Sequence, residues 1–143
     1  MGNRVEKAVE LFKSGYNCAQ SVFTAYADFY GIDKELALKL SSSFGRGIGG
    51  MHEICGAVCG MSMLVGLELG TTVAKDLDKR KVNYEAVQKL ANDFREEHGS
   101  IVCKLSLEHD QEVAPGKKRK PCVEYVRYCA ELIEKTILNN NQD

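Results

Sequence analysis

Six cysteines are the residues of this chain best suited to chemistry, because a thiolate is both the nucleophile of thiol–disulfide exchange and a ligand for iron or zinc. The start of the chain carries no apolar signal segment, so we expect a cytoplasmic protein whose thiols are kept reduced. Metal binding or redox work is therefore favoured over a structural disulfide framework. The cysteines are Cys18, Cys55, Cys59, Cys103, Cys122 and Cys129.

Two of these cysteines follow sequence signals for the start of a helix. In SGYNCAQS, Ser14 or Asn17 is a suitable N-cap, which places Cys18 in or next to the first helical turn. In GRGIGGMHEICGA, a glycine-rich loop leads into an apolar helix, and Cys55 lies near the beginning of that helix.

Two further cysteines follow similar signals in the second half of the chain. In HGSIVCKL, Ser100 as N-cap makes Cys103 the third helical residue, and in KRKPCVEY, Pro121 at the first helical position makes Cys122 the second. The N-terminus of a helix presents unpaired N–H groups and the positive end of the dipole, which stabilise a thiolate and lower the pKa of the thiol. This placement suits metal binding and thiol chemistry alike.

The remaining two cysteines fall inside predicted helices among apolar neighbours, where cysteine is usually a small buried hydrophobe. Cys59 shares a helix face with Cys55, four residues earlier, so the two thiols could assist each other. Cys129 lies seven residues after Cys122, about 10 Å along the helix axis, which is too far for a disulfide.

Glycines and histidines near the cysteines are weaker candidates. Gly56 and Gly60 are one helical turn apart, so a cofactor can approach there, and they are the candidate cofactor-binding residues; a plain helix–helix contact explains them equally well. GRGIGG is not a phosphate-binding loop, since no strand precedes it and no GKS or GKT follows. His52, His98 and His109 are expected at the surface, and without CxxC or HxxxH a standard structural zinc module is excluded.

Apolar residues recur at helical spacing nearly everywhere, and no strand-like alternation competes with them. We predict an all-α fold, a compact single-domain bundle of five or six helices over residues 1–143 with glycine-rich connections. One helix is expected at 83–98, and the last helix carries Cys122 and Cys129 on one stripe. The polar segment 108–121 is predicted to be a surface loop, in which the basic residues at 117–120 face water or an acidic partner.

Composition excludes several classes of function. A formal charge of −1, with 27% charged residues, gives no basic field for nucleic acid. The uncharged apolar run at 54–67 is shorter than the roughly 20 residues that cross a bilayer. The chain has no nucleophile elbow and no HExxH, which argues against a hydrolase. Nucleic acid and membranes are thus not expected as partners, whereas a redox partner protein and a homo-oligomer stay open.

Four cysteine motifs together resemble one known family. They are GYNCAQSV at 15–22, the glycines at 49 and 50 with CGAVCG at 55–60, GSIVCKL at 99–105 and PCVEYVRYCAELI at 121–133. In order and spacing the chain, from about residue 8 to 133, resembles the C_GCAxxG_C_C family of redox-active proteins. The four cysteines of the family pattern fall on Cys18, Cys55, Cys103 and Cys122, and Cys59 and Cys129 lie outside it.

The resemblance implies a helical domain, redox activity and kinship with a domain of certain multihaem cytochromes in which such cysteines hold an iron–sulfur centre. This chain has no CxxCH motif, so no covalent haem is expected. Three hypotheses follow. The four cysteines bind an iron–sulfur cluster or another thiophilic metal for electron transfer; or the chain is a thiol–disulfide oxidoreductase without metal, its cysteine pairs unassigned; or it is a non-catalytic helical module with buried cysteines.

Overall fold

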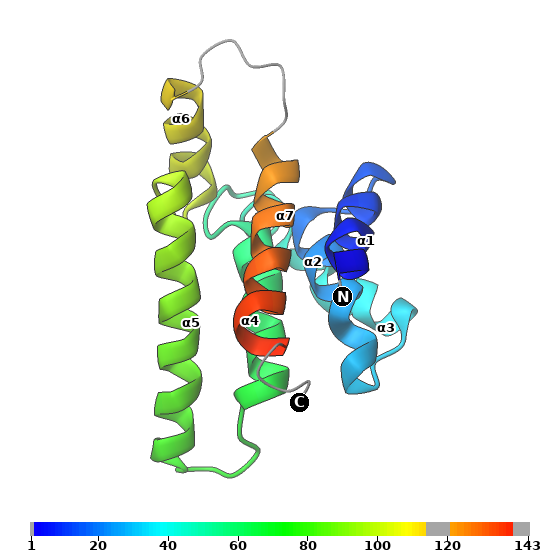
Figure 1. Cartoon of the computed structure of the whole chain (residues 1–143), viewed down its shortest axis with the longest axis vertical. Helices are drawn as coiled ribbons and strands as arrows, with labels where there is room; N and C mark the ends of the chain where they lie inside the picture. The colour runs from blue at the N-terminus through cyan, green and yellow to red at the C-terminus, as the bar shows by residue number, and fades with distance from the viewer. Residues whose placement is uncertain (1, 114–120, 139–143) are drawn as a thin grey trace.

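Helices make up most of the chain that the structure describes. The structure is a computed structural model, and it describes residues 2–113 and 121–138 (Figure 1). None of the described helices combines the length and the apolar character that a membrane span needs. The α-helices are α1 Gly2–Lys13, α2 Cys18–Ala27, α3 Lys34–Ser41, α4 Gly56–Leu69, α5 Leu77–His98, α6 Cys103–Val113 and α7 Pro121–Leu132. The 3₁₀ turns η1 Asp28–Tyr30 and η2 Ser42–Phe44 follow α2 and α3, and a π-helical turn, η3 Ile133–Leu138, extends α7.

The all-α prediction is confirmed, but the expected number of five or six helices is too low, since the described residues form seven α-helices. The extent of α6 also differs, since this helix continues through EHDQEV at 108–113, a stretch predicted to be loop. This stretch has no apolar stripe, so no helical period could be read from it. The basic residues at 117–120 lie outside the described residues. A helix was expected at 83–98, and α5 begins earlier, at Leu77.

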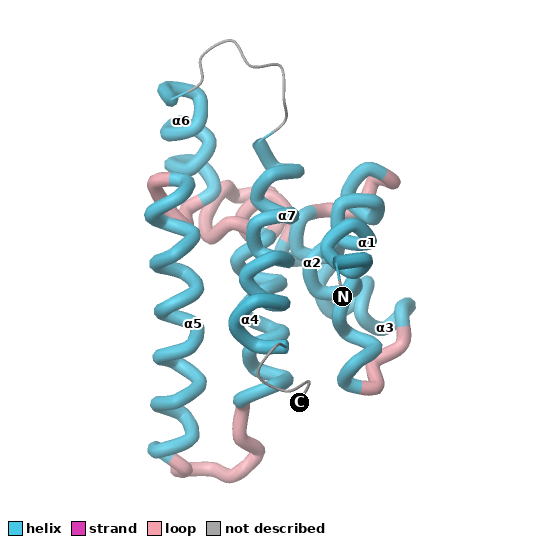
Figure 2. The backbone as a smooth tube through the Cα atoms, viewed as in Figure 1, coloured by secondary structure: helices cyan, strands magenta, loops and turns pink. Residues whose placement is uncertain are grey.

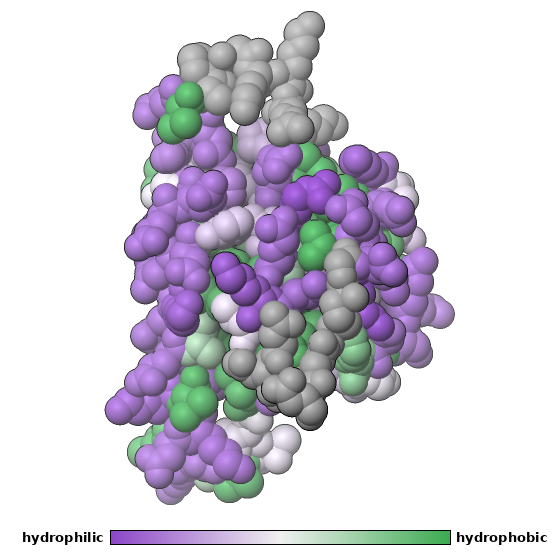
Figure 3. Space-filling view, viewed as in Figure 1, coloured by the Kyte–Doolittle hydropathy of each residue, from purple (hydrophilic) through white to green (hydrophobic). Residues whose placement is uncertain are grey.

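α4 and α7 occupy the middle of the molecule, with α5 along one side and α1, α2 and α3 along the other (Figure 1). α2 packs along α4, and α1 packs against both α2 and α7. The outer side of α5 is largely polar (Figure 3). The apolar core therefore lies between α2, α4 and α7, whose first turns carry or adjoin three of the four family cysteines.

Two glycines let α2 and α4 approach closely. A Cβ atom at Gly60 would lie 2.8 Å from the carbonyl oxygen of Ala19, and one at Gly56 would lie 2.9 Å from that of Phe44 and 3.4 Å from Cβ of Cys18. Contacts this close to backbone atoms leave no room for a side chain. The helix–helix contact accounts for both glycines, and a cofactor role for Gly56 and Gly60 stays a prediction.

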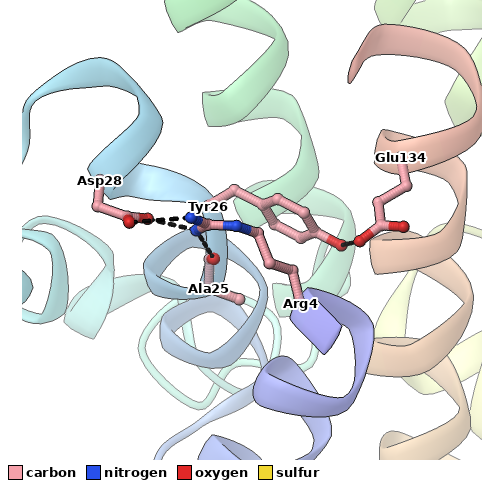
Figure 4. A network of polar contacts seen from close by, with 5 residues as sticks. All are labelled: Arg4, Ala25, Tyr26, Asp28 and Glu134. Carbon is pink, nitrogen blue, oxygen red and sulfur yellow. Dashed lines mark hydrogen bonds and ion pairs between the residues drawn. The ribbon is translucent and has the colours of Figure 1, made fainter. Parts of the chain in front are cut away.

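A polar network ties α1, α2 and η3 together at the side of the core (Figure 4). Arg4 donates hydrogen bonds of 2.5 and 3.1 Å to the carboxylate of Asp28. The hydroxyl of Tyr26, which is fully buried, donates to the carbonyl oxygen of Ala130 and to Glu134, both at 3.1 Å. The hydrogen bonds of Tyr26 thereby fix the end of α7 and the beginning of η3 to α2.

Candidate functional site

Two loops hold the beginnings of α4 and α6 side by side (Figure 2). An isolated antiparallel bridge joins the residues just before each helix. The N–H of Cys55 donates to the carbonyl oxygen of Ile101 at 2.7 Å, and the N–H of Cys103 donates to that of Glu53 at 2.5 Å. Because the donors are the backbone N–H groups of Cys55 and Cys103, these hydrogen bonds fix the backbone positions of both cysteines.

The start of α6 differs from its prediction. The hydroxyl of Ser100 accepts a hydrogen bond from the N–H of Val102 at 3.0 Å, in a turn that precedes the helix. Cys103 is therefore the first residue of α6 and not the third. Cys55 is the N-cap of α4, as its predicted position near the helix start required.

Cys18 is the first residue of α2, and Asn17 rather than Ser14 is the N-cap. The side chain of Asn17 accepts from the N–H of Gln20 at 2.9 Å, and the side chain of Gln20 accepts from the N–H of Asn17 at 3.1 Å. This reciprocal capping box fixes the first turn of the helix. A side chain at Gly45 would collide with Asn17, so the glycine-rich loop lies directly against this helix start.

The four helix-start thiols act on one another, and we name them the thiol cluster: Cys18, Cys55, Cys103 and Cys122. The thiol of Cys18 donates a hydrogen bond to Cys122, the second residue of α7. The charge of a Cys122 thiolate also acts on Cys55 and Cys103, and those two act on Cys18. Four separate helix starts thus bring their sulfurs within electrostatic reach of one another.

Burial opposes ionisation in the thiol cluster. Cys55 is 2% exposed, and this burial raises its pKa to about 12, although the N–H groups of Val58 and Ala57 pull in the other direction. Desolvation disfavours the charged thiolate more than the helix N-terminus favours it. The lowered pKa expected at a helix start is therefore wrong for Cys55.

The pKa of two further cluster thiols is raised as well. Cys18 is 8% exposed, and its hydrogen bond to Cys122, together with burial, raises its pKa far above the usual range. Cys103 is 6% exposed, and burial raises its pKa while the charge of Arg46 lowers it. Cys122 is only half-buried. The cluster thus has a buried side and a side near the surface.

A left-handed turn lies between η2 and α4. Residues 46–50 all have positive φ, between 50° and 79°, and two of them, Arg46 and Ile48, are not glycine. Such backbone strain is stored where the surrounding structure holds it, often at functional sites. The N–H of His52 donates to the carbonyl oxygen of Arg46 at 2.9 Å, and Nδ1 of His52 lies 3.4 Å from Sγ of Cys103. Arg46 was missed from sequence, although it is the one charged residue within GRGIGG.

Comparison with known proteins gives one match. A family model described as "Putative redox-active protein (C_GCAxxG_C_C)" matches residues 16–136. The chain belongs to this family. The matched range contains the whole thiol cluster, and it gives the chain a redox character without specifying the reaction. No curated protein and no solved structure matches the chain.

Two cysteines outside the C_GCAxxG_C_C pattern have surroundings of their own. Cys129 is completely buried, which raises its pKa well above the usual value. Cys59 is half-buried, and burial raises its pKa to about 11; its thiol lies 3.8 Å from the carbonyl oxygen of Ile54, to which it donates. Both agree with the interpretation of these residues as small apolar side chains within helices.

The histidines divide between the surface and the interior. His52 is exposed, as expected, and His109 is half-buried, but His98 is buried at the end of α5, where its predicted surface position is wrong. Nδ1 of His98 lies 3.0 Å from Oδ2 of Asp110, which also accepts a 2.6 Å hydrogen bond from the hydroxyl of Tyr125. These three side chains join α5, α6 and α7. The helical spacing did carry this signal, since position 98 continues the buried face of Leu90 and Phe94, but a histidine was expected at the surface from its residue type.

Metal binding was one expectation for the family cysteines. Within residues 2–113 and 121–138, no group of three or more histidine, cysteine, aspartate or glutamate side chains is placed so that it could hold a metal ion. Burial also favours the protonated thiols of Cys18, Cys55 and Cys103, whereas a metal binds thiolates. The thiols as arranged do not fit a single metal ion, so we derive no step through one.

Proposed function

We propose that this member of the C_GCAxxG_C_C family is a thiol–disulfide oxidoreductase whose working pair is Cys18 and Cys122. The observation that carries the proposal is the hydrogen bond between these two thiols. Two thiols joined by a hydrogen bond are near enough to form a disulfide with limited movement of the backbone. The contact joins the start of α2 to the start of α7 and selects a pair that sequence spacing left open.

Cys122 is the attacking thiol in this proposal. It is half-buried, whereas Cys18 is 8% exposed, so a substrate reaches Cys122 first. The S–H of Cys18 donates to Cys122 and stabilises its thiolate, as does the N-terminus of α7. The thiolate attacks one sulfur of a substrate disulfide, the substrate S–S bond breaks, a mixed disulfide forms, and the other substrate sulfur leaves as a thiolate.

Cys18 then resolves the mixed disulfide. The sulfur of Cys122 is now part of a neutral disulfide, so the two effects of Cys122 that raise the pKa of Cys18, the hydrogen bond and the charge, are both weakened. Cys18 gives its proton to the departing substrate thiolate and attacks the sulfur of Cys122, which forms the Cys18–Cys122 disulfide and releases the second substrate thiol. Two electrons have passed to the substrate, and a dithiol donor must return them.

Cys55 and Cys103 form a second dithiol beside this pair. Their thiols interact electrostatically with Cys18 and Cys122. Exchange of the disulfide from one pair to the other needs no outside oxidant, because the number of S–S bonds does not change. This exchange would move the oxidised bond away from the surface.

An iron–sulfur cluster is the second candidate, favoured by the convergence of four thiols from four helix starts. Cys18, Cys55, Cys103 and Cys122 would hold it, and when bound it would supply one-electron transfer. Iron and sulfide analysis with a visible spectrum, on protein purified without oxygen, separates the two candidates. Stoichiometric iron and sulfide with charge-transfer bands would replace the dithiol proposal.

The dithiol proposal is tested by turnover of a small neutral disulfide with dithiothreitol as the electron donor. We expect Cys122→Ser to abolish turnover above the uncatalysed rate. When the reduced Cys18→Ser variant meets the disulfide without dithiothreitol, we expect a mixed disulfide on Cys122 that mass spectrometry detects. Cys129→Ser is the control, since this buried thiol lies outside the cluster. Full turnover by Cys122→Ser would contradict the assignment.

A further inference from the structure

One charged side chain stands out beside the thiol cluster. Arg46 is exposed, and it lies in the left-handed turn at 46–50. Its carbonyl oxygen accepts from the N–H of His52 at 2.9 Å, and the ring of the same histidine lies 3.4 Å from the sulfur of Cys103. The turn therefore fixes the backbone of Arg46 next to the residue that touches the cluster.

The charges of Arg46 and Cys122 act in opposite directions on the thiol of Cys103. The positive charge of Arg46 favours the Cys103 thiolate, while a thiolate at Cys122 disfavours it. The guanidinium is thus close enough to the cluster to influence a charge on sulfur. Lys104, the next residue of α6, is also exposed, and its N–H donates to the carbonyl oxygen of His52 at 3.2 Å.

Negative charge is present on the same turn, and its position matters. Glu53 is exposed, but its backbone is used on both sides: its N–H donates to the carbonyl oxygen of Gly47 at 2.9 Å, and its carbonyl oxygen accepts from Cys103. The positive charge of Arg46 favours the Cys103 thiolate, against the larger opposing effects of burial and of a thiolate at Cys122.

We propose that the thiol cluster acts on disulfides that carry a carboxylate near the S–S bond, and that Arg46 is the residue that selects them. This inference rests on the proposed function, because it names the substrate class of the same site. A guanidinium binds a carboxylate through two parallel N–H···O bonds. When Cys122 attacks, negative charge moves onto the departing sulfur, and the same cation stabilises it.

The test compares three aliphatic disulfides of similar size: dithiodipropionate, which is a dianion, hydroxyethyl disulfide, which is neutral, and cystamine, which is a dication. Reduced wild-type protein is mixed with each, and the second-order rate constant of protein oxidation is measured at low and high salt. We expect Arg46→Gln to slow the reaction with the dianion about tenfold at low salt. The effect on the neutral disulfide should be small, and salt should weaken the difference.

Two control variants keep the result specific to charge at this turn. Arg46→Lys keeps the charge and should retain most of the preference for the dianion, while Arg80→Gln removes an arginine near the start of α5, far from the α6 start, and should change nothing. Equal slowing of all three disulfides by Arg46→Gln, or no preference for the dianion in the wild type, would overturn the inference and leave the proposed function intact. No reaction of the wild type with any of the three would overturn both.

Discussion

Cysteine occurs in two different environments in this molecule. Cys55, at the start of α4, is 2% exposed, and Cys129, inside α7, is 0% exposed, so burial does not distinguish them. What differs is the company of each sulfur. Both sulfurs belong to the apolar core, but Cys55 also faces the N–H groups of a helix start, whereas Cys129 lies inside α7, where the charges of Cys55 and Cys59 act on it. The two sulfurs therefore differ in their neighbours and backbone donors and not in their exposure.

The largest expected difference between the two regions appears when one cysteine in each is replaced by serine. Cys18→Ser should lower disulfide turnover at least ~100-fold, because Cys18 is the thiol that resolves the mixed disulfide at Cys122 in the proposed mechanism. Cys129→Ser should keep turnover and instead lower the free energy of unfolding by about 1–3 kcal/mol, because a hydroxyl is buried in an apolar site. Turnover assays and urea unfolding of both variants measure the two effects. Loss of turnover in the Cys129 variant alone would reverse the assignment of the two regions.

The packing between the regions is tested by adding a methyl group to α4. Gly60→Ala should lower the free energy of unfolding by about 1–3 kcal/mol, because its Cβ would lie 2.8 Å from the carbonyl oxygen of Ala19 and push α2 away. Gly66→Ala is the matched control on the same helix, since nothing lies within 4 Å of its Cβ. The control should stabilise the protein by about 0.5–1 kcal/mol. Equal effects of the two substitutions on chemical unfolding would show that α2 does not pack against α4 as described.

Alkaline pH should lower the free energy of unfolding, because the native state keeps its buried thiols protonated. The pKa of Cys55 is about 12 in the native state against 9.0 for an ordinary thiol, so between these values the unfolded chain has lost a proton that the native chain keeps. The contribution of this thiol to the free energy of unfolding is fully present below pH 9. It falls as the pH rises, by about 1.4 kcal/mol per pH unit for one such thiol. Denaturant titrations of the reduced protein between pH 8 and pH ~11 measure this slope. Cys55→Ser should flatten it, and an unchanged slope in that variant would contradict the protonated state of the native thiol.

The smallest expected effect lies in the polar network away from the cluster. Tyr26→Phe removes the hydrogen bonds to Ala130 and Glu134 and should lower the free energy of unfolding by about 1 kcal/mol. Disulfide turnover should stay at the wild-type rate, because the network holds η3 and contains no thiol. A turnover rate that fell with stability would show that the two regions are coupled.

Local signals in the sequence predicted the positions of the cysteines well. Asn17 and Pro121 mark where α2 and α7 begin, and capping depends on a few neighbouring residues. The error at Cys103 is of the same local kind, since Ser100 bonds within a turn instead of capping the helix. The prediction of an all-α fold held because apolar spacing is legible wherever a helix packs on the core.

Properties that depend on contacts between residues distant in sequence could not be predicted from the sequence. Cys18 and Cys122 are far apart in sequence, and no spacing rule pairs them, yet their hydrogen bond is the feature that assigns roles. The raised pKa of Cys55 depends on how deeply the packed helices bury it, which opposes the local effect of the helix start. The approach of Arg46 to Cys103 depends on a left-handed turn that GRGIGG permits but does not specify.

The most direct test of the central claim is to map the first disulfide that forms. Protein purified and reduced without oxygen is treated with one equivalent of hydroxyethyl disulfide, remaining thiols are alkylated, and the linked peptides are identified by mass spectrometry. The account predicts a Cys18–Cys122 disulfide, with Cys59 and Cys129 recovered as alkylated thiols. A first disulfide that includes Cys59 or Cys129, or a preparation in which iron and sulfide occupy the four cluster thiols, would contradict it.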